Sequence, residues 1–168
     1  MKIKNILMCA LPGAFLAFAP AAFTAEKGNP DEAFIKKAAD GGMTEVELGQ
    51  IAAKNAQQQE VKDFGNQMVK DHGKANNDLK AVAGKLKVPV PEKVSAKHQA
   101  KIDKMAKMTG AAFDQAYVQD MVKDHELDIA EFEAADKEVK DADLKKFIEK
   151  TVPVMKHHLA MVKKLAAK

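Results

Sequence analysis

The chain has 168 residues, 46% of them hydrophobic, and its 27 basic residues, all lysine, face 24 acids. The lysines are spread among the acids, and a chain without Lys2 and Lys4 would carry a net charge of about +1. This balance argues against a nucleic-acid partner, because phosphate binding needs a clustered basic surface. The absence of arginine also argues against bidentate recognition of phosphate or carboxylate.

Residues 1–25 have the pattern of a secretory signal peptide. A lysine-containing start precedes an apolar run over residues 6–18, and residues 19–21 (Ala-Pro-Ala) match a signal-peptidase site. We predict cleavage between Ala21 and Ala25 and export to the periplasm. The remaining segment, 26–168, has the size of one domain with one core.

Cys9 is the only cysteine, and it lies within this predicted signal peptide. A lipoprotein interpretation is disfavoured, since most of the apolar run follows Cys9. The mature chain would then have no disulfide and would be held together by packing alone. No later segment is apolar enough to predict a transmembrane span.

The pattern after the signal peptide is helical, without alternating strand runs, and proline and glycine fall mostly at breaks. A Val-Pro-Val-Pro linker at residues 88–91 should stop the second helix, and Pro153 should kink the last one. The fold class is therefore all-α: a ferritin-like four-helix bundle with a short extra helix in the connection between the second and third long helices. The expected helices are Asp31–Ala56, Gln59–Leu86, Ser95–Met108, Ala111–Val139 and Asp141–Ala166. The long connection leaves open whether the chain returns locally or crosses the length of the bundle.

Each of the four long helices carries an apolar stripe at steps of three and four residues, broken near its middle by one side chain of metal-ligand type. These side chains are Glu45, His72, His125 and His158. Each helix is about 40 Å long, and the midpoints of equal helices in a bundle share one level. The four residues should therefore converge. Three imidazoles and a carboxylate suit a transition metal such as Zn, Cu or Fe.

Asp71 and Asp124 precede two of these histidines in an identical run, Met-Val-Lys-Asp-His. Adjacent residues of a helix do not face each other, so each Asp would have to reach a histidine on another helix as a hydrogen-bond acceptor. A solvated acid is the simpler interpretation for both.

Four methionines near the same level are candidate thioether ligands for Cu(I), although methionine more commonly fills a core. They are Met68, Met121, Met155 and Met161. His157 is a substitute candidate for His158 but lies off the stripe, and His98 is expected to face solvent. Nucleophile, phosphate-loop, haem-attachment and zinc-protease motifs are absent from the sequence, so an enzyme is the less favoured interpretation.

The order and spacing of several motifs in the mature chain resemble one bacterial family. They are Gly41 to Gly49, Met68 to His72, Gly110 to Asp114 with Tyr117, and Pro153 with His158-Leu159. The sequence is similar to the exported family called domain of unknown function 4142, which is placed among ferritin-like bundles. The resemblance implies this fold and a location in the cell envelope, and it implies little about chemistry.

The sequence departs from ferritins at the metal site. Di-iron carboxylate bundles use Glu-x-x-His on two helices, whereas Val69, Val122 and Met155 stand three residues before the three histidines. This argues against di-iron chemistry and favours one metal ion or none.

Two functions follow as hypotheses. The first is a periplasmic bundle that binds a single transition metal ion for buffering or a stress response. The alternative is a metal-free structural or stress-related interaction module with a buried Glu/His network. The sequence leaves open the protein partner and whether the chain forms a homo-oligomer.

Overall fold

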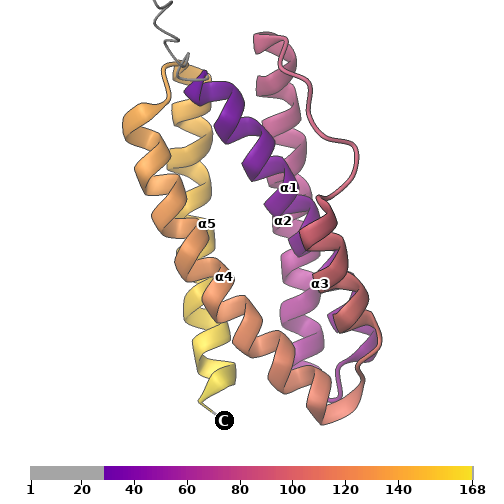
Figure 1. The fold of residues 1–168 in the computed structure, drawn as a ribbon. Coiled ribbons are helices and arrows are strands. Elements are labelled where there is room, and N and C mark those ends of the chain that lie inside the picture. Colours follow the sequence, from indigo (N-terminus) through magenta and orange to yellow (C-terminus); the bar gives the residue numbers. More distant parts are fainter. Residues whose placement is uncertain (1–28, 168) are drawn as a thin grey trace, which may run out of the picture.

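The computed structural model describes residues 29–167, which form five helices and no strand (Figure 1). The predicted signal peptide, with Cys9 and the cleavage site, lies outside the described residues. The helices are α1 (Pro30–Asn55), α2 (Gln59–Leu86), α3 (Ala96–Ala106), α4 (Gly110–Glu138) and α5 (Ala142–Ala166). The prediction of an all-α bundle of four long helices with one short extra helix is confirmed, and every helix end lies within two residues of its predicted place.

Local chemistry explains where the helices begin and end. Asn29 caps α1 by accepting a hydrogen bond from the Asp31 amide at 3.0 Å, and Pro30 occupies the first helical position. Asp141 caps α5 in the same way, through the Leu144 amide at 2.9 Å. Lys87 ends α2 in the left-handed conformation, with φ of 57°.

The connection from α2 to α4 crosses the length of the bundle. The linker over residues 87–95 and then α3 carry the chain back to the end at which α2 began, as the ribbon shows (Figure 1). Since short turns join α1 to α2 and α4 to α5, each of these pairs is antiparallel, and α2 runs parallel to α4. This resolves the topology that the sequence left open.

Two buried aspartates hold the opposite ends of this arrangement. Asp114, near the start of α4, accepts hydrogen bonds from the backbone amides of Gln57 at 2.9 Å and Gln58 at 2.8 Å, in the α1–α2 turn. Asp31, at the start of α1, accepts from the amides of Lys140 at 2.6 Å and Asp141 at 3.2 Å, in the α4–α5 turn. Each buried carboxylate thus accepts from backbone N–H groups in the turn of the other helical pair.

The buried apolar side chains form two clusters rather than one continuous core. One cluster, toward the start of α1, contains Phe34, Ile35, Leu79, Leu144, Phe147 and Ile148. The other, toward the α1–α2 turn, contains Leu48, Phe64, Met68, Phe113, Tyr117 and Met121. Along each long helix, the residue predicted as a ligand lies between the two clusters and belongs to neither. A polar layer therefore divides the core of the bundle at mid-height.

The buried face of α5 differs from the predicted stripe. The steps of three and four residues that lead to His158 would place Val154 in the core, but Val154 is 38% exposed, whereas Met155 is 2% exposed. The buried face instead passes through Ile148, Met155 and Val162, at the heptad spacing of helices packed in a bundle. Pro153 lies inside α5, which continues on both sides of it.

The outer surface carries lysines interspersed with acids, as the composition predicted. Ion pairs link neighbouring helices, for example Lys156 with Glu133 at 2.7 Å and Lys163 with Glu126 at 2.6 Å, both between α5 and α4. Within the described residues, no helix has both the length and the apolar character needed to cross a bilayer.

Candidate metal centre

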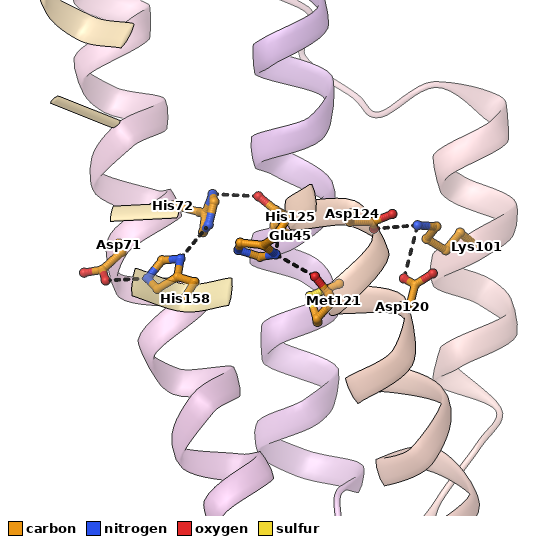
Figure 2. Close-up of polar contacts among 9 residues, drawn as sticks. All are labelled: Glu45, Asp71, His72, Lys101, Asp120, Met121, Asp124, His125 and His158. Atoms are coloured by element: carbon orange, nitrogen blue, oxygen red, sulfur yellow. Dashed lines mark hydrogen bonds and ion pairs between the residues drawn. The ribbon is translucent and has the colours of Figure 1, made fainter. Parts of the chain in front are cut away.

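The polar layer consists of one side chain from each long helix. Glu45 of α1, His72 of α2, His125 of α4 and His158 of α5 point toward one another in the middle of the bundle (Figure 2). They are 4%, 5%, 0% and 0% exposed, respectively, so all four are withdrawn from water. Buried groups of this kind need hydrogen-bonding or charged partners, because their desolvation is unfavourable.

Each imidazole is held by a hydrogen-bond acceptor at one ring nitrogen. His72 donates from Nδ1 to Glu45 Oε2 at 2.7 Å. His125 donates from Nδ1 to the Met121 backbone carbonyl at 2.9 Å. His158 donates from Nε2 to Asp71 Oδ2 at 2.8 Å. A carboxylate or carbonyl can only accept, so each bond fixes which nitrogen carries hydrogen.

The remaining three nitrogens face the interior of the layer. His72 Nε2 lies 3.3 Å from His158 Nδ1, and His125 Nε2 is buried without a hydrogen-bond partner. One nitrogen of each histidine lies within 4.8 Å of one nitrogen of both others. If all three rings were neutral, three lone pairs would converge on a small buried volume, an arrangement that a proton, a hydrogen-bond donor such as water, or a metal cation would relieve.

The pKa shifts of Glu45, His72 and His158 indicate which groups of the layer carry charge. Burial alone would raise the pKa of Glu45, but the neighbouring imidazoles, His72 foremost, lower it to about 2, so Glu45 is a carboxylate. Burial works to lower the pKa of His72, whereas the charge and hydrogen bond of Glu45 outweigh it and leave this pKa raised. Burial leaves the pKa of His158 lowered, despite its bond to Asp71. Of His72 and His158, His72 is therefore the ring that is more readily protonated.

The donor set fits a single transition metal ion. Neutral imidazole nitrogens bind Zn, Cu, Ni and Fe, and a metal-bound histidine usually donates its other N–H to a carboxylate or carbonyl. All three histidines already make that second bond. Zinc–imidazole bonds of about 2.0–2.1 Å require ligand nitrogens on the order of 3.5 Å apart, and the 3.3 Å between His72 Nε2 and His158 Nδ1 already agrees with this.

Glu45 occupies a different place from the histidines. Its Oε2 is bonded to His72 Nδ1, and its Oε1 lies 3.6 Å from His125 Nδ1 and has no hydrogen-bond partner. Both contacts are on the outer nitrogens of the rings, away from the side where the lone pairs meet. The geometry gives Glu45 the position of an orienting carboxylate, and direct coordination by Glu45 stays a prediction.

The two aspartates of the identical runs have different partners. Asp71 accepts a hydrogen bond from His158 on α5. Of the two interpretations of Asp71, an acceptor for a histidine on another helix therefore holds, rather than a solvated acid. Asp124 instead bonds Lys101 of α3 at 2.6 Å, and the same ammonium lies 3.1 Å from Asp120 (Figure 2). Asp124 therefore makes no contact with the histidines.

The remaining candidates lie around the layer. Met68 and Met121 are fully buried in the apolar cluster beside it, and Met121 contributes its backbone carbonyl. His157 is exposed, as expected. His98 was expected to face solvent, but it is half-buried and lies 2.9 Å from Asp40 of α1.

Sequence reasoning missed Asp128, one turn beyond His125. Burial, and then the charge of Glu45, raise the pKa of Asp128 to about 8. A signal was available, since Asp120, Asp124 and Asp128 recur every four residues and so share one face of α4. What could not be deduced is that this face turns toward α1 and α3 rather than toward water.

Comparison with known proteins identifies the family and the fold. The family model for the domain of unknown function DUF4142 matches residues 17–165, so the chain belongs to this family. No curated protein sequence matches it.

Several solved structures share the fold at low sequence identity. A DUF305 fragment from Deinococcus radiodurans has a TM-score of 0.72 at 11% identity, covering 82% of this chain and 95% of that one. A putative secreted DUF305 protein from Streptomyces coelicolor has a TM-score of 0.70 at 14% identity, covering 83% and 93%. CopM in its Cu(I)-bound form has a TM-score of 0.66 at 14% identity, covering 80% and 93%, and CopM is also similar in Cu(II)- and Ag-bound forms.

Proposed function

We propose that this protein is an exported, periplasmic helical bundle that binds one transition metal ion through His72, His125 and His158. The observation that carries the proposal is the hydrogen-bond pattern of the triad. Each ring donates one N–H to a fixed acceptor and directs its other nitrogen toward the two remaining rings. This is the arrangement that prepares neutral histidines as ligands.

Copper is the ion we propose first, with zinc and iron as the alternatives. Imidazole nitrogens suit copper, and buried methionines adjoin the layer. CopM, which has a similar fold, occurs in copper- and silver-bound forms, and this similarity supports the choice. No step of a reaction is assigned to the site, and the proposed role is binding or buffering of the metal.

A metal-free interaction module is the second candidate, and one observation favours it. The raised pKa of His72 allows its ring to be protonated, bonding Glu45 at 2.7 Å and His158 at 3.3 Å. The layer then satisfies much of its own hydrogen bonding without an ion, as a buried network that specifies how the helices pack.

Metal titration separates the two candidates. We expect the purified mature chain to bind one equivalent of Cu(I) or Cu(II), with a large rise in melting temperature, because ligands that bind only the native state stabilise it. The His125→Ala/His158→Ala double variant should remain helical and lose this binding. His157→Ala changes the exposed neighbour of His158 and is the matched control.

Retention of full stoichiometry in the double variant would exclude the triad as the site. A native chain that binds no copper, zinc or iron would instead support the metal-free network.

A further inference from the structure

A groove between α2 and α5 leads from the surface to the triad. It encloses about 470 Å³, and its lining includes Asp71 and His72 from α2 together with Thr151, Val154 and Met155 from α5. A space of this size accommodates a small organic molecule. A second groove of about 590 Å³, beside α1, α2 and the linker, is lined by none of the three histidines.

The exposed fractions of the three imidazole side chains agree with access to the triad from the α2–α5 groove. His125 and His158 are 0% exposed at their side chains, whereas His72 retains 6% and Asp71 retains 22%. His72 is also the only one of the three histidines among the residues that line the groove. An ion held by the triad would thus be reached past His72, between α2 and α5.

The rim of this groove carries more positive than negative charge. Four lysines line it, Lys74, Lys85, Lys146 and Lys150, against three acids, Asp71, Asp78 and Asp143. Lys74 pairs with Asp78 at 2.6 Å and Lys85 with Asp143 at 2.7 Å. The surplus of ammonium groups disfavours the approach of a bare cation and favours a small anion.

We propose that the α2–α5 groove is the exchange port of the metal centre, through which a small polycarboxylate ligand enters and carries the ion to or from His72. The proposal rests on metal binding by the triad. The lysines of the rim would draw the carboxylates into the groove, where they would reach the ion beside His72, the ring of the triad that lines it. Release exchanges histidine nitrogens for carboxylate oxygens one at a time, without any change in oxidation state.

The test measures how fast nitrilotriacetate, a small tricarboxylate, removes Cu(II) from the loaded protein. Val154→Trp narrows the groove at a residue that is already 38% exposed, and Leu127→Trp places the same ring on α4, at a residue that is 58% exposed and outside the groove. We expect Val154→Trp to slow removal roughly tenfold with stoichiometry unchanged, and Leu127→Trp to leave the rate as it is. Lys150→Glu should slow removal by a similar factor and Lys123→Glu, at an exposed residue of α4, should not.

The outcomes distinguish this proposal from the metal site itself. One equivalent of bound copper, with removal equally fast in all four variants, would leave the site intact and overturn the port. Removal slowed only in Val154→Trp and Lys150→Glu would establish it. If no variant and no native chain binds copper, zinc or iron, the metal centre fails, and the port fails with it.

Discussion

Asp71 Oδ2 lies 2.8 Å from His158 Nε2 (Figure 2). This hydrogen bond links α2 to α5 at the ring nitrogen of His158 that does not face His72. Gln67 donates a second hydrogen bond to the same carboxylate oxygen at 2.6 Å. Burial works to raise the pKa of Asp71, but these bonds leave it lowered, so the group is an anion at neutral pH. Asp71 thereby fixes the tautomer of His158 that directs Nδ1 toward His72.

Replacing Asp71 should therefore weaken metal binding without removing a ligand. We expect Asp71→Asn to lower metal affinity about 10- to 100-fold, because it removes the negative charge of the acceptor that orients His158 and raises its basicity. Isothermal titration of native and variant chains with copper measures the change, and circular dichroism checks that the helices are retained.

Asp124→Asn is the matched control, since Asp124 occupies the same place in an identical five-residue run but bonds Lys101. It should change metal affinity by less than about threefold, because Asp124 is bonded to Lys101 and not to a histidine of the triad. Equal losses of affinity in the two variants would contradict a specific role for Asp71.

Glu45→Gln tests whether the carboxylate of α1 coordinates the ion or orients the rings. Because Glu45 contacts the outer nitrogens of His72 and His125, the variant should still bind one equivalent, with affinity about 10- to 100-fold lower. The metal-free variant should also lose stability, by about 1–3 kcal/mol, as the charged partner of His72 is gone. Stoichiometry and urea unfolding are the two measurements.

Glu47→Gln, two residues along α1, serves as its control and should alter neither quantity appreciably. Complete loss of metal in Glu45→Gln, with the triad unchanged, would mean that Glu45 is itself a ligand.

The two aspartates also show how far the sequence determines the site. Helical periodicity and equal helix lengths suffice to place Glu45, His72, His125 and His158 at one level, because those rules depend on the backbone alone. Local sequence cannot separate Asp71 from Asp124, whose neighbours are identical. Their partners differ because α5 packs beside α2, whereas α3 covers α4 and brings Lys101 to Asp124.

The atoms that meet within the layer could not be predicted for the same reason. Whether Glu45 faces the inner or the outer nitrogen of His72 depends on the rotation of α1 and α2 about their axes. The rotation of α5 about its axis likewise decides that Met155, and not the adjacent Val154, faces the core.

The docking of α3 should depend on pH through Asp40. Burial works to raise the pKa of Asp40, but the hydrogen bonds from Ser95, and then His98, leave it below its usual 3.8. A carboxylate whose pKa is lowered by folding stabilises the fold above its unfolded pKa and loses that contribution as the pH falls through the lowered value. We therefore expect α3 to loosen at pH 3 and below while it stays docked at pH 6.

Hydrogen exchange of the α3 amides, corrected for intrinsic rates, measures this loosening. In Asp40→Asn the amides of Ala96–Ala106 should exchange faster at pH 6 and should show little further change on acidification. Acid-induced exchange in α3 that is identical in native chain and variant would contradict the role of Asp40.

The close approach of α1 and α2 about two helical turns from His72 gives the last prediction. A Cβ added at Gly65 would lie 2.8 Å from both the Ala52 Cβ and the Gly49 carbonyl oxygen, atoms fixed to the α1 backbone. Gly65→Ala should therefore force the two helices apart and lower the free energy of unfolding by about 1–3 kcal/mol, although alanine is the better helix former.

At Gly84, in the same helix, an added Cβ meets nothing within 4 Å, so Gly84→Ala should raise the free energy of unfolding by up to about 1 kcal/mol. Urea unfolding of the two variants should give opposite signs. Since the same helices carry Glu45 and His72, Gly65→Ala should also weaken metal binding, and a stabilised Gly65→Ala chain with unchanged affinity would show that this helix contact does not position the site.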